Sequence, residues 1–302
     1  MSARLVVSAP AKLNLFLHVT GRREDGYHLL ETLFCLLDHG DTVTLALRGD
    51  GQICRNDDLP GVPAEQDLCV RAARLLQQAS GSTSGVDIGL VKRLPMGGGL
   101  GGGSSDAAAV LLGLNRLWQL DWSRQRLQSL ALRLGADVPV FVFGRSAFAR
   151  GIGEQLEPVC LPLSWYVVLE PPVEISTARI FASQRLTRNS ESVRITDFSG
   201  GVQPDFSGGV SAQPQCLSLA AIMARTRNDL QQVACAEFPA VAEALQWLSQ
   251  YAPARMTGSG ACVFACFDNE ARARQVLAGL PTGMRGFVAR GLSSHPQYDW
   301  AG

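Results

Sequence analysis

A glycine-rich segment constrains this chain more than any other feature of its sequence. Residues 95–106 read Pro-Met-Gly-Gly-Gly-Leu-Gly-Gly-Gly-Ser-Ser-Asp. Because glycine has no side chain, the backbone N–H groups of such a run can converge on one anionic ligand. The apolar spacing of residues 107–118 predicts an amphipathic helix directly afterwards, with Ser104 or Ser105 as its N-cap. A helix start adds free N–H groups and a positive dipole end, so the segment predicts a phosphate-binding loop.

Other interpretations of the segment fit less well. A flexible linker or a β-bulge turn is also rich in glycine, but this segment is anchored by Leu94, Met96 and Leu100 and by the apolar helix. It is not a Walker P-loop, since no Gly-Lys-Ser/Thr follows. Three of its glycines satisfy the G-x-G-x-x-G pattern of dinucleotide sites, but a run this rich in glycine satisfies most glycine patterns. The preceding strands also have the pattern of hairpins rather than of a βαβ unit.

The overall composition excludes several classes of protein. The 302 residues are 46% hydrophobic and 18% charged, which suits one large or two medium domains and rules out wholesale disorder. Basic and acidic residues balance at 27 each, so we expect no partner that is bound by bulk charge, neither nucleic acid nor an anionic membrane. No run approaches the roughly 20 apolar residues of a membrane span, and no signal peptide is recognisable.

The eight cysteines and four histidines show no metal-binding spacing. No C-x-x-C pair occurs, and two of the cysteines lie in the apolar, strand-like run Ala261-Cys-Val-Phe-Ala-Cys-Phe267. We therefore expect buried free thiols, a reducing cytoplasm and no protein-bound metal site.

Lysine is almost absent from the chain. Of the 27 basic residues, 25 are arginine, and Lys12 and Lys92 are the two lysines. In Pro10-Ala-Lys-Leu-Asn-Leu, Lys12 and Asn14 are two residues apart, so they share one face of a strand. That face is either solvated at a sheet edge or directed at an anionic partner, and the residues alone leave both open. Lys92 lies shortly before the glycine-rich segment.

Two further segments carry candidate functional groups. Asp137 leads the apolar run Val-Pro-Val-Phe-Val-Phe, and a carboxylate there is either a cap or a general base. Met256-Thr-Gly-Ser-Gly260 forms a second, smaller glycine turn before a buried-looking strand.

The order of the remaining segments predicts an α+β fold, because strands occur in runs mixed with helices. We place a domain boundary between residues 155 and 156. Two copies of Asp-Phe-Ser-Gly-Gly-Val within 197–210 indicate a mobile surface insertion. The expected strands are 4–19 (interrupted at Pro10), 29–47, 86–90, 165–169 and 261–267, and the expected helices are 67–79, 123–134 (with Gly135 as its C′ residue), 217–234, 240–250 and 269–279.

Taken together, five segments resemble the GHMP kinase superfamily, and within it the kinases of 4-(cytidine 5'-diphospho)-2-C-methyl-D-erythritol. The segments are Pro10-Ala-Lys-Leu-Asn-Leu-Phe-Leu17, Gly21-Arg-Arg-Glu-Asp-Gly-Tyr-His28, residues 95–105, Leu134-Gly-Ala-Asp-Val-Pro139 and Thr257-Gly-Ser-Gly260. The resemblance implies a ribosomal-S5-like, ATP-binding domain (1–155), a ferredoxin-like domain (156–302) and an active site in the cleft between them. It also implies ATP-dependent phosphorylation of the substrate's 2-hydroxyl group in the non-mevalonate route to isoprenoid precursors, in the bacterial cytoplasm.

The resemblance further implies which residues act. Asp137 would accept the proton of the acceptor hydroxyl, and Lys12 would hold that carboxylate and offset charge on the transferring phosphoryl group. ATP, with Mg²⁺ bridging its phosphates, would lie against the glycine-rich segment, and Lys92 would lie near the adenine. The matching ATP-binding residues are Lys92, Pro95, Met96, Gly97, Gly98, Gly99, Leu100, Gly101, Gly102, Gly103, Ser104 and Ser105.

Four residues match the family's substrate pocket. Tyr27 and Phe181 would stack on the cytosine, and His28 would hydrogen-bond to it. Asn14 would line the same pocket. One position departs from the family, which commonly has asparagine where this chain has Asp67, so the adenine contact made there is in doubt.

Three alternatives stay open at this point. Another GHMP kinase, acting on homoserine or mevalonate, would have no base to stack on Tyr27 and Phe181. A regulatory nucleotide-binding module would leave Asp137 without a role, and a dinucleotide-dependent oxidoreductase ranks last. The oligomeric state does not follow from the sequence.

Overall fold

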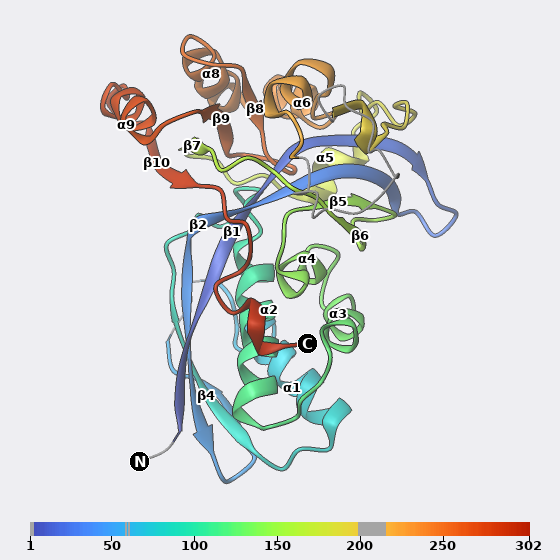
Figure 1. Ribbon diagram of the computed structural model, residues 1–302, viewed down its shortest axis with the longest axis vertical. Coiled ribbons are helices and arrows are strands. Elements are labelled where there is room, and N and C mark those ends of the chain that lie inside the picture. The colour runs from blue at the N-terminus through green and yellow to red at the C-terminus, as the bar shows by residue number, and fades with distance from the viewer. Residues whose placement is uncertain (1–2, 58, 60, 199–215) are drawn as a thin grey trace, which may run out of the picture.

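The computed structural model describes residues 3–57, 59, 61–198 and 216–302. A long antiparallel hairpin, β1 (Arg4–Arg22) and β2 (His28–Arg48), runs through most of its length (Figure 1). The interruption expected at Pro10 is confirmed as a register shift between Pro10 and Lys12. Gly40 lies opposite, and a Cβ there would come within 2.2 Å of the Ala9 carbonyl oxygen, so the shift requires glycine at this position.

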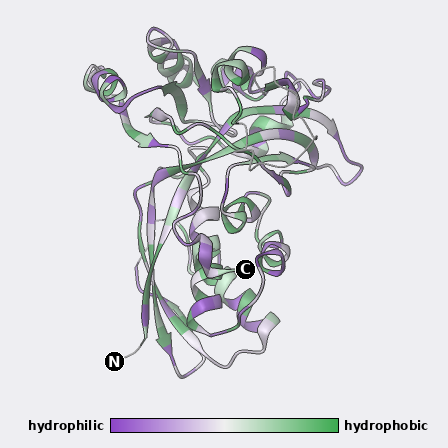
Figure 2. Cartoon of the chain, viewed as in Figure 1, coloured by the Kyte–Doolittle hydropathy of each residue, from purple (hydrophilic) through white to green (hydrophobic). Residues whose placement is uncertain are grey.

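The first sheet is built around β2. In the described part of the chain its order is β3-β4-β2-β5-β6, with β1 also paired to β2. Four helices lie on one side of this sheet and enclose the first apolar core (Figure 1). The central one, α2 (Gly102–Leu117), is buried from Ser105 to Asn115. The other elements are β3 (Ile53–Arg55), β4 (Gly85–Val91), β5 (Ala147–Arg150), β6 (Gln155–Pro158), α1 (Leu68–Ser80), α3 (Arg124–Ala131) and α4 (Val138–Phe143), the last almost wholly hydrophobic (Figure 2).

The second sheet is antiparallel and has the order β10-β7-β9-β8. Helices α8 and α9 pack on it and form the second core. Leu17 and Val19 of β1 belong to that core as well, so the hairpin joins both halves of the molecule. The elements of this half are β7 (Trp165–Glu170), α5 (Thr177–Ala182), η1 (Ile195–Phe198), α6 (Leu219–Arg225), α7 (Gln231–Glu237), α8 (Pro239–Leu248), β8 (Ala254–Met256), β9 (Val263–Phe267), α9 (Glu270–Ala278), β10 (Arg285–Arg290) and η2 (Tyr298–Trp300).

The predicted α+β class is confirmed, with two sheets in the described residues, but three helix predictions are wrong in detail. Helix α2 begins earlier than expected, because Gly101 adopts φ 74° and takes the N-cap position predicted for Ser104 or Ser105. Helix α3 ends at Ala131, so Gly135 is not its C′ residue.

The expected helix 217–234 is two helices, α6 and α7. The residues between them lie against β1 instead of continuing the helix, with a hydrogen bond from Leu17 N to the Arg227 carbonyl (3.0 Å) and one from Asp229 N to the Leu17 carbonyl (2.8 Å). Pairing with the hairpin therefore overrides the local helical pattern.

The expectation that all cysteines are free thiols is wrong for one pair. Cys160 and Cys216 form a disulfide, while the other six are free. The pair is 56 residues apart in the chain and no spacing motif announces it. The two cysteines lie side by side in the fold, where Leu217 N donates a hydrogen bond to the Cys160 carbonyl at 2.9 Å.

Two other sequence predictions are not decided by the fold. The repeat insertion lies outside the described residues except for Asp197 and Phe198. The domain boundary at 155/156 stays a prediction. It falls at the start of β6, and β6 pairs with β5 in the first sheet. No helix in the described ranges is long and apolar enough to cross a membrane.

Candidate functional site

A single large cavity brings the predicted site residues together. It has a volume of about 970 Å³, at the upper end of the range for small-molecule sites. The two catalytic candidates, the four substrate-pocket candidates and all predicted ATP-binding residues except Ser105 line it. Ser105 is fully buried, and its hydroxyl donates to the Pro10 carbonyl oxygen at 2.7 Å. Its side chain therefore ties α2 to β1.

The glycine loop owes its shape to backbone conformations that glycine tolerates. Gly97, Gly99 and Gly101 have φ values of 65°, 76° and 74°. At Gly99 a Cβ would lie 2.2 Å from the Thr257 carbonyl oxygen, so a side chain is excluded there by contact as well as by φ. The loop leads directly into the free N–H groups of α2, which is the arrangement expected for binding phosphate.

The second glycine turn lies against the first. Ala261 N donates to the Gly97 carbonyl at 3.3 Å, and Cys262 N donates to the Gly98 carbonyl at 3.1 Å. Thr257 accepts from Asn14 N at 2.9 Å through its hydroxyl. The two halves of the molecule therefore meet at the glycine loop through backbone hydrogen bonds.

Lys12 is a buried residue of the cavity wall, with 2% of its side chain exposed. Its ammonium donates to Asn14 Oδ1 at 2.5 Å and to the Gly99 carbonyl at 2.9 Å. The backbone N–H of Lys12 also donates to the Leu100 carbonyl at 3.0 Å. The open question about this strand face is thus answered: Lys12 and Asn14 face the glycine loop and not bulk solvent.

Asp137 is the acidic partner of Lys12. Its Oδ2 lies 3.5 Å from Lys12 Nζ, and 42% of its side chain is exposed to the cavity and solvent. It occupies the N-cap position of α4 but makes no side-chain capping bond. The carboxylate is therefore free to accept a proton, which favours the general-base interpretation over the cap.

The aromatic candidates lie at another part of the cavity wall. The rings of His28 and Phe181 stack with centroids 4.8 Å apart, while Tyr27 is 60% exposed. Arg188 Nε donates to His28 Nε2 at 3.1 Å, and its Nη2 donates to the Phe181 carbonyl at 2.9 Å. Burial, followed by the charges of Arg188 and Arg22, lowers the pKa of His28, so its ring is neutral at physiological pH.

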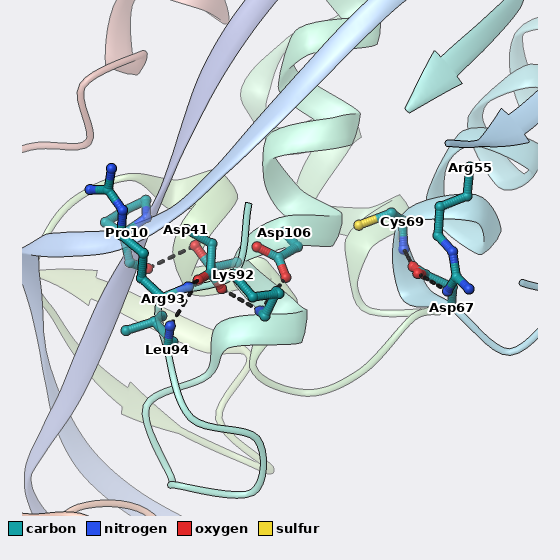
Figure 3. Close-up of polar contacts among 10 residues, drawn as sticks. Pro10, Asp41, Arg55, Asp67, Cys69, Lys92, Arg93, Leu94 and Asp106 are labelled. Carbon is teal, nitrogen blue, oxygen red and sulfur yellow. Dashed lines mark hydrogen bonds and ion pairs between the residues drawn. The ribbon is translucent and has the colours of Figure 1, made fainter. Parts of the chain in front are cut away.

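Beside the glycine loop, Lys92 is paired with two buried acids (Figure 3). Its ammonium donates to Asp41 Oδ2 and, at 2.7 Å, to Asp106 Oδ2. Burial alone would lower the pKa of Lys92, but the two carboxylates outweigh it and raise the pKa above its ordinary value. Burial raises the pKa of Asp106 to about 7, with Asp41 adding to the effect and Lys92 opposing it.

Asp67 is occupied on both of its oxygens. Oδ1 caps α1 by accepting from Cys69 N at 2.7 Å, and Oδ2 accepts from Arg55 Nη1 at 2.7 Å (Figure 3). Asp67 and the Arg55 side chain are buried, and Arg55 also donates to the Val62 carbonyl. Each Asp67 oxygen thus already accepts a hydrogen bond from the protein, and the adenine contact at this position stays a prediction.

Several residues that shape the site were missed in the sequence. Asp41, Asp106 and Arg188 contact site residues that are between 14 and 160 positions away in the chain. The signal for Asp106 was present, because it ends the glycine-rich segment, and a carboxylate that close to bound phosphate needs a cationic partner. No comparable signal marks Arg188, which is one of 25 arginines.

The described residues include no group of three or more side chains that could hold a metal ion. Carboxylates do reach the cavity, in Asp137 and in the Lys92-paired Asp106. This donor set suits a Mg²⁺ ion that is held mainly by nucleotide phosphates, since Mg²⁺ commonly uses one or two protein carboxylates in such sites.

Two family models match the chain. Residues 67–145 match the GHMP kinases N terminal domain, and residues 215–286 match the GHMP kinases C terminal model. Relatives of similar length have high identity. A 4-diphosphocytidyl-2-C-methyl-D-erythritol kinase of Thiobacillus denitrificans is 59% identical, covering 97% of each chain, and one of Nitrosospira multiformis is 55% identical, covering 99% of this chain and 95% of its own.

Solved structures agree in fold. A crystal structure of 4-(cytidine 5'-diphospho)-2C-methyl-D-erythritol kinase superposes with a TM-score of 0.75 at 32% identity and covers 95% of this chain and 99% of its own. A homoserine kinase from Cytophaga hutchinsonii reaches a TM-score of 0.70 at 17% identity, covering 98% and 96%, which shows a shared fold alone.

Proposed function

Because the chain belongs to the GHMP kinase family, and within it to the 4-diphosphocytidyl-2-C-methyl-D-erythritol kinases, we propose that it transfers the γ-phosphoryl group of ATP to the 2-hydroxyl of 4-(cytidine 5'-diphospho)-2-C-methyl-D-erythritol. This reaction supplies a precursor in non-mevalonate isoprenoid biosynthesis. The observation that carries the chemistry is the Lys12–Asp137 pair, 3.5 Å apart, in a cavity that also contains the glycine loop and the aromatic residues.

In this proposal Asp137 is the general base. The substrate's 2-hydroxyl oxygen forms the new bond to the γ-phosphorus, the bond from that phosphorus to the β-bridging oxygen of ATP breaks, and the hydroxyl proton passes to Asp137. Lys12 keeps the carboxylate in place and stabilises negative charge on the transferring group. Asn14 and the Gly99 carbonyl hold the Lys12 ammonium, so it is fixed before the reaction begins.

We assign the phosphates of ATP to the glycine loop and the start of α2. The positive φ values of the loop and the free N–H groups of the helix support this assignment. Mg²⁺, entering with ATP, would neutralise part of the phosphate charge.

The location we propose is the cytoplasm, where ATP is the phosphoryl donor.

The cytidine base is assigned to the aromatic wall formed by Tyr27, His28 and Phe181. The exposed Tyr27 ring offers a free face, whereas Phe181 stacks on His28 and would exchange that contact for the base. Homoserine and mevalonate have no base to use this wall. The similarity to a homoserine kinase at 17% identity extends to the fold and gives no reason to assign its substrate.

The direct test is ATP consumption with purified protein and three acceptors in parallel. We expect turnover with 4-(cytidine 5'-diphospho)-2-C-methyl-D-erythritol and, at the same enzyme concentration, none with mevalonate or homoserine. Cytidine diphosphate should inhibit competitively against the acceptor. Turnover of mevalonate or homoserine with no cytidine inhibition would overturn the substrate assignment.

A further inference from the structure

Three charged side chains beside the glycine loop form a cluster with no role in the proposal above. We call Asp41, Lys92 and Asp106 the carboxylate–lysine cluster (Figure 3). The Asp41 and Asp106 carboxylates are 0% and 3% exposed, and the Lys92 side chain is 24% exposed. Two buried carboxylates sharing one ammonium are costly to desolvate, so such a cluster must be held by precise contacts.

Asp41 connects three separate parts of the site. It lies in β2 next to the register shift that precedes Lys12 on β1. Its Oδ1 accepts from Arg93 N at 2.5 Å and from Leu94 N at 2.9 Å, while its Oδ2 accepts from Lys92 (Figure 3). One carboxylate therefore fixes the turn that enters the glycine loop to the strand pair that carries the catalytic lysine.

Asp106 connects the same ammonium to α2. It is four residues after Gly102, the first residue of that helix. A Cβ built on Gly102 would lie 3.3 Å from Lys92 Nζ and 3.4 Å from Asp41 Oδ2, so the cluster contacts the loop backbone where the helix begins. Asp106 Oδ1 is buried and finds no hydrogen-bond partner among the described residues.

The charges explain why the lysine is needed. Asp106 is the fifth residue of α2, in its second turn, and its carboxylate would repel phosphates that bind at the helix start. The Lys92 ammonium, with two of its three donors on carboxylates, offsets that repulsion at a distance too short for solvent to screen. Lys92 is thus already paired, and it is not a spare positive charge for ATP.

We propose that Asp41 and Asp106 are positioning residues of the ATP site. They hold Lys92 against the loop backbone at Gly102 and set the spacing between the residue 93–94 turn and the first turn of α2. The inference rests on the proposed function, because it requires the glycine loop to bind ATP.

The two acids should respond differently to amide substitution. In Asp41→Asn no orientation of the amide can satisfy the two N–H groups and the ammonium together, so we expect KM for ATP to rise about tenfold or more. KM for the cytidine substrate should stay within about twofold of wild type. Asp106→Asn can still accept from Lys92 with its one oxygen, so its KM for ATP should rise less. Asp41→Glu, which keeps the charge, should recover part of the loss.

A matched control is Asp87→Asn. This substitution removes an aspartate from β4 whose pair with Arg48 (2.8 Å) does not touch the loop, and it should leave both KM values at wild type. An unchanged KM for ATP in Asp41→Asn, or an equal rise of both KM values, would overturn the proposal. If Asp41→Asn does not fold, Asp106→Ala takes its place in the test. A wild-type KM for ATP in Asp106→Ala would then overturn the proposal.

The two proposals fail in different ways. Isothermal calorimetry can measure the affinity for ATP of wild type and of Asp41→Asn in the absence of acceptor. This comparison does not depend on which acceptor the enzyme uses. Weaker ATP binding in the variant supports the positioning role even where turnover of the cytidine substrate fails. If wild type and Asp41→Asn are both active and bind ATP with equal affinity, the positioning role of Asp41 is wrong. The kinase assignment would then still stand.

Discussion

Asp137 shows how a residue can be placed by a helix without serving it. It stands at the N-cap of α4 with no side-chain capping bond and is 42% exposed, so helix α4 does not depend on its charge. Asp137→Asn should therefore lower kcat by about 100- to 10,000-fold while the melting temperature stays close to wild type. Single-turnover phosphoryl transfer at saturating substrate and thermal unfolding by circular dichroism measure the two quantities. A kcat near wild type would remove Asp137 as the base.

Phe181 gives a test of the base pocket at the same scale. Replacing it with alanine removes a stacking surface, and one base–aromatic stack contributes about 1–3 kcal/mol. We therefore expect Phe181→Ala to raise KM for the cytidine substrate by about 5- to 150-fold and to leave KM for ATP unchanged. Tyr251→Ala is the control, because it breaks an aromatic pair with Trp247 away from the cavity. Equal KM values for Phe181→Ala and this control would exclude the ring from recognition.

At the residue scale, the sequence marked the proposed catalytic residues more clearly than the residues that contact the site from elsewhere in the chain. Lys12 and Asp137 stand out because a lone lysine and a lone acid each interrupt an apolar run. Asp41 and Arg188 act through partners 51 and 160 positions away, and nothing local distinguishes them from surface charges. Such partners become visible only when the fold brings the strands and loops together.

At the scale of elements, the glycine loop can be tested position by position. Gly99→Ala places a Cβ 2.2 Å from the Thr257 carbonyl oxygen in a residue with φ 76°. Left-handed strain and overpacking together should lower the free energy of unfolding by about 2–5 kcal/mol and weaken ATP binding. Gly103→Ala is the matched change, because its Cβ would meet Leu68 Cδ1 at an ordinary 3.6 Å, and its effect should be clearly smaller. Urea unfolding and ATP calorimetry of the two variants would contradict this account if they gave equal losses.

The same scale shows where sequence patterns predict secondary structure well and where they do not. Apolar patterns located β1, β2, β4, α1 and α2, because each contributes a run of buried apolar residues to the first core. Boundaries failed where another part of the chain competes for the backbone. Segment 226–230 pairs with Leu17, and Asn228 donates to the Met256 and Gly258 carbonyls at 2.8 Å each, so the helix expected there is broken. Long-range pairing of this kind leaves no periodic signal.

For the whole molecule, the β1–β2 hairpin explains why the site lies where it does. One end of the hairpin packs in the first core and the other end in the second, so Lys12 and Asn14 lie between the two halves (Figure 1). The C-terminal segment strengthens the connection by returning to the first half. There Arg124 donates to the carbonyls of Val142 at 2.6 Å and Ala301 at 2.8 Å, and also to that of Tyr298.

A buried histidine in that returning segment makes its docking sensitive to acid. His295 is 2% exposed, its backbone N donates to the Gly144 carbonyl at 2.7 Å, and its Nδ1 accepts from Gln297 N at 3.1 Å. Burial, with a smaller effect of the Arg124 charge, lowers the pKa of His295 from 6.5 to about 4. The folded protein thus disfavours the protonated ring. The resulting stability is fully present above about pH 6.5 and is lost as the pH falls toward 4.

We therefore expect His295→Asn, which keeps an acceptor and cannot titrate, to flatten the fall in stability between pH 6.5 and 4. The wild-type loss assigned to His295 is on the order of 3 kcal/mol over that interval, from a shift of that size at 1.36 kcal/mol per pKa unit. Asp106→Asn serves as a comparison, because the stability contribution of Asp106 changes with pH in the opposite direction to that of His295. Since burial raises the pKa of Asp106 to about 7, its contribution is present at acid pH and is lost as the pH rises from about 4 to 7. Urea unfolding of the three proteins at half-unit pH steps measures both slopes. Parallel curves for wild type and His295→Asn would show that the docked segment does not depend on a neutral His295.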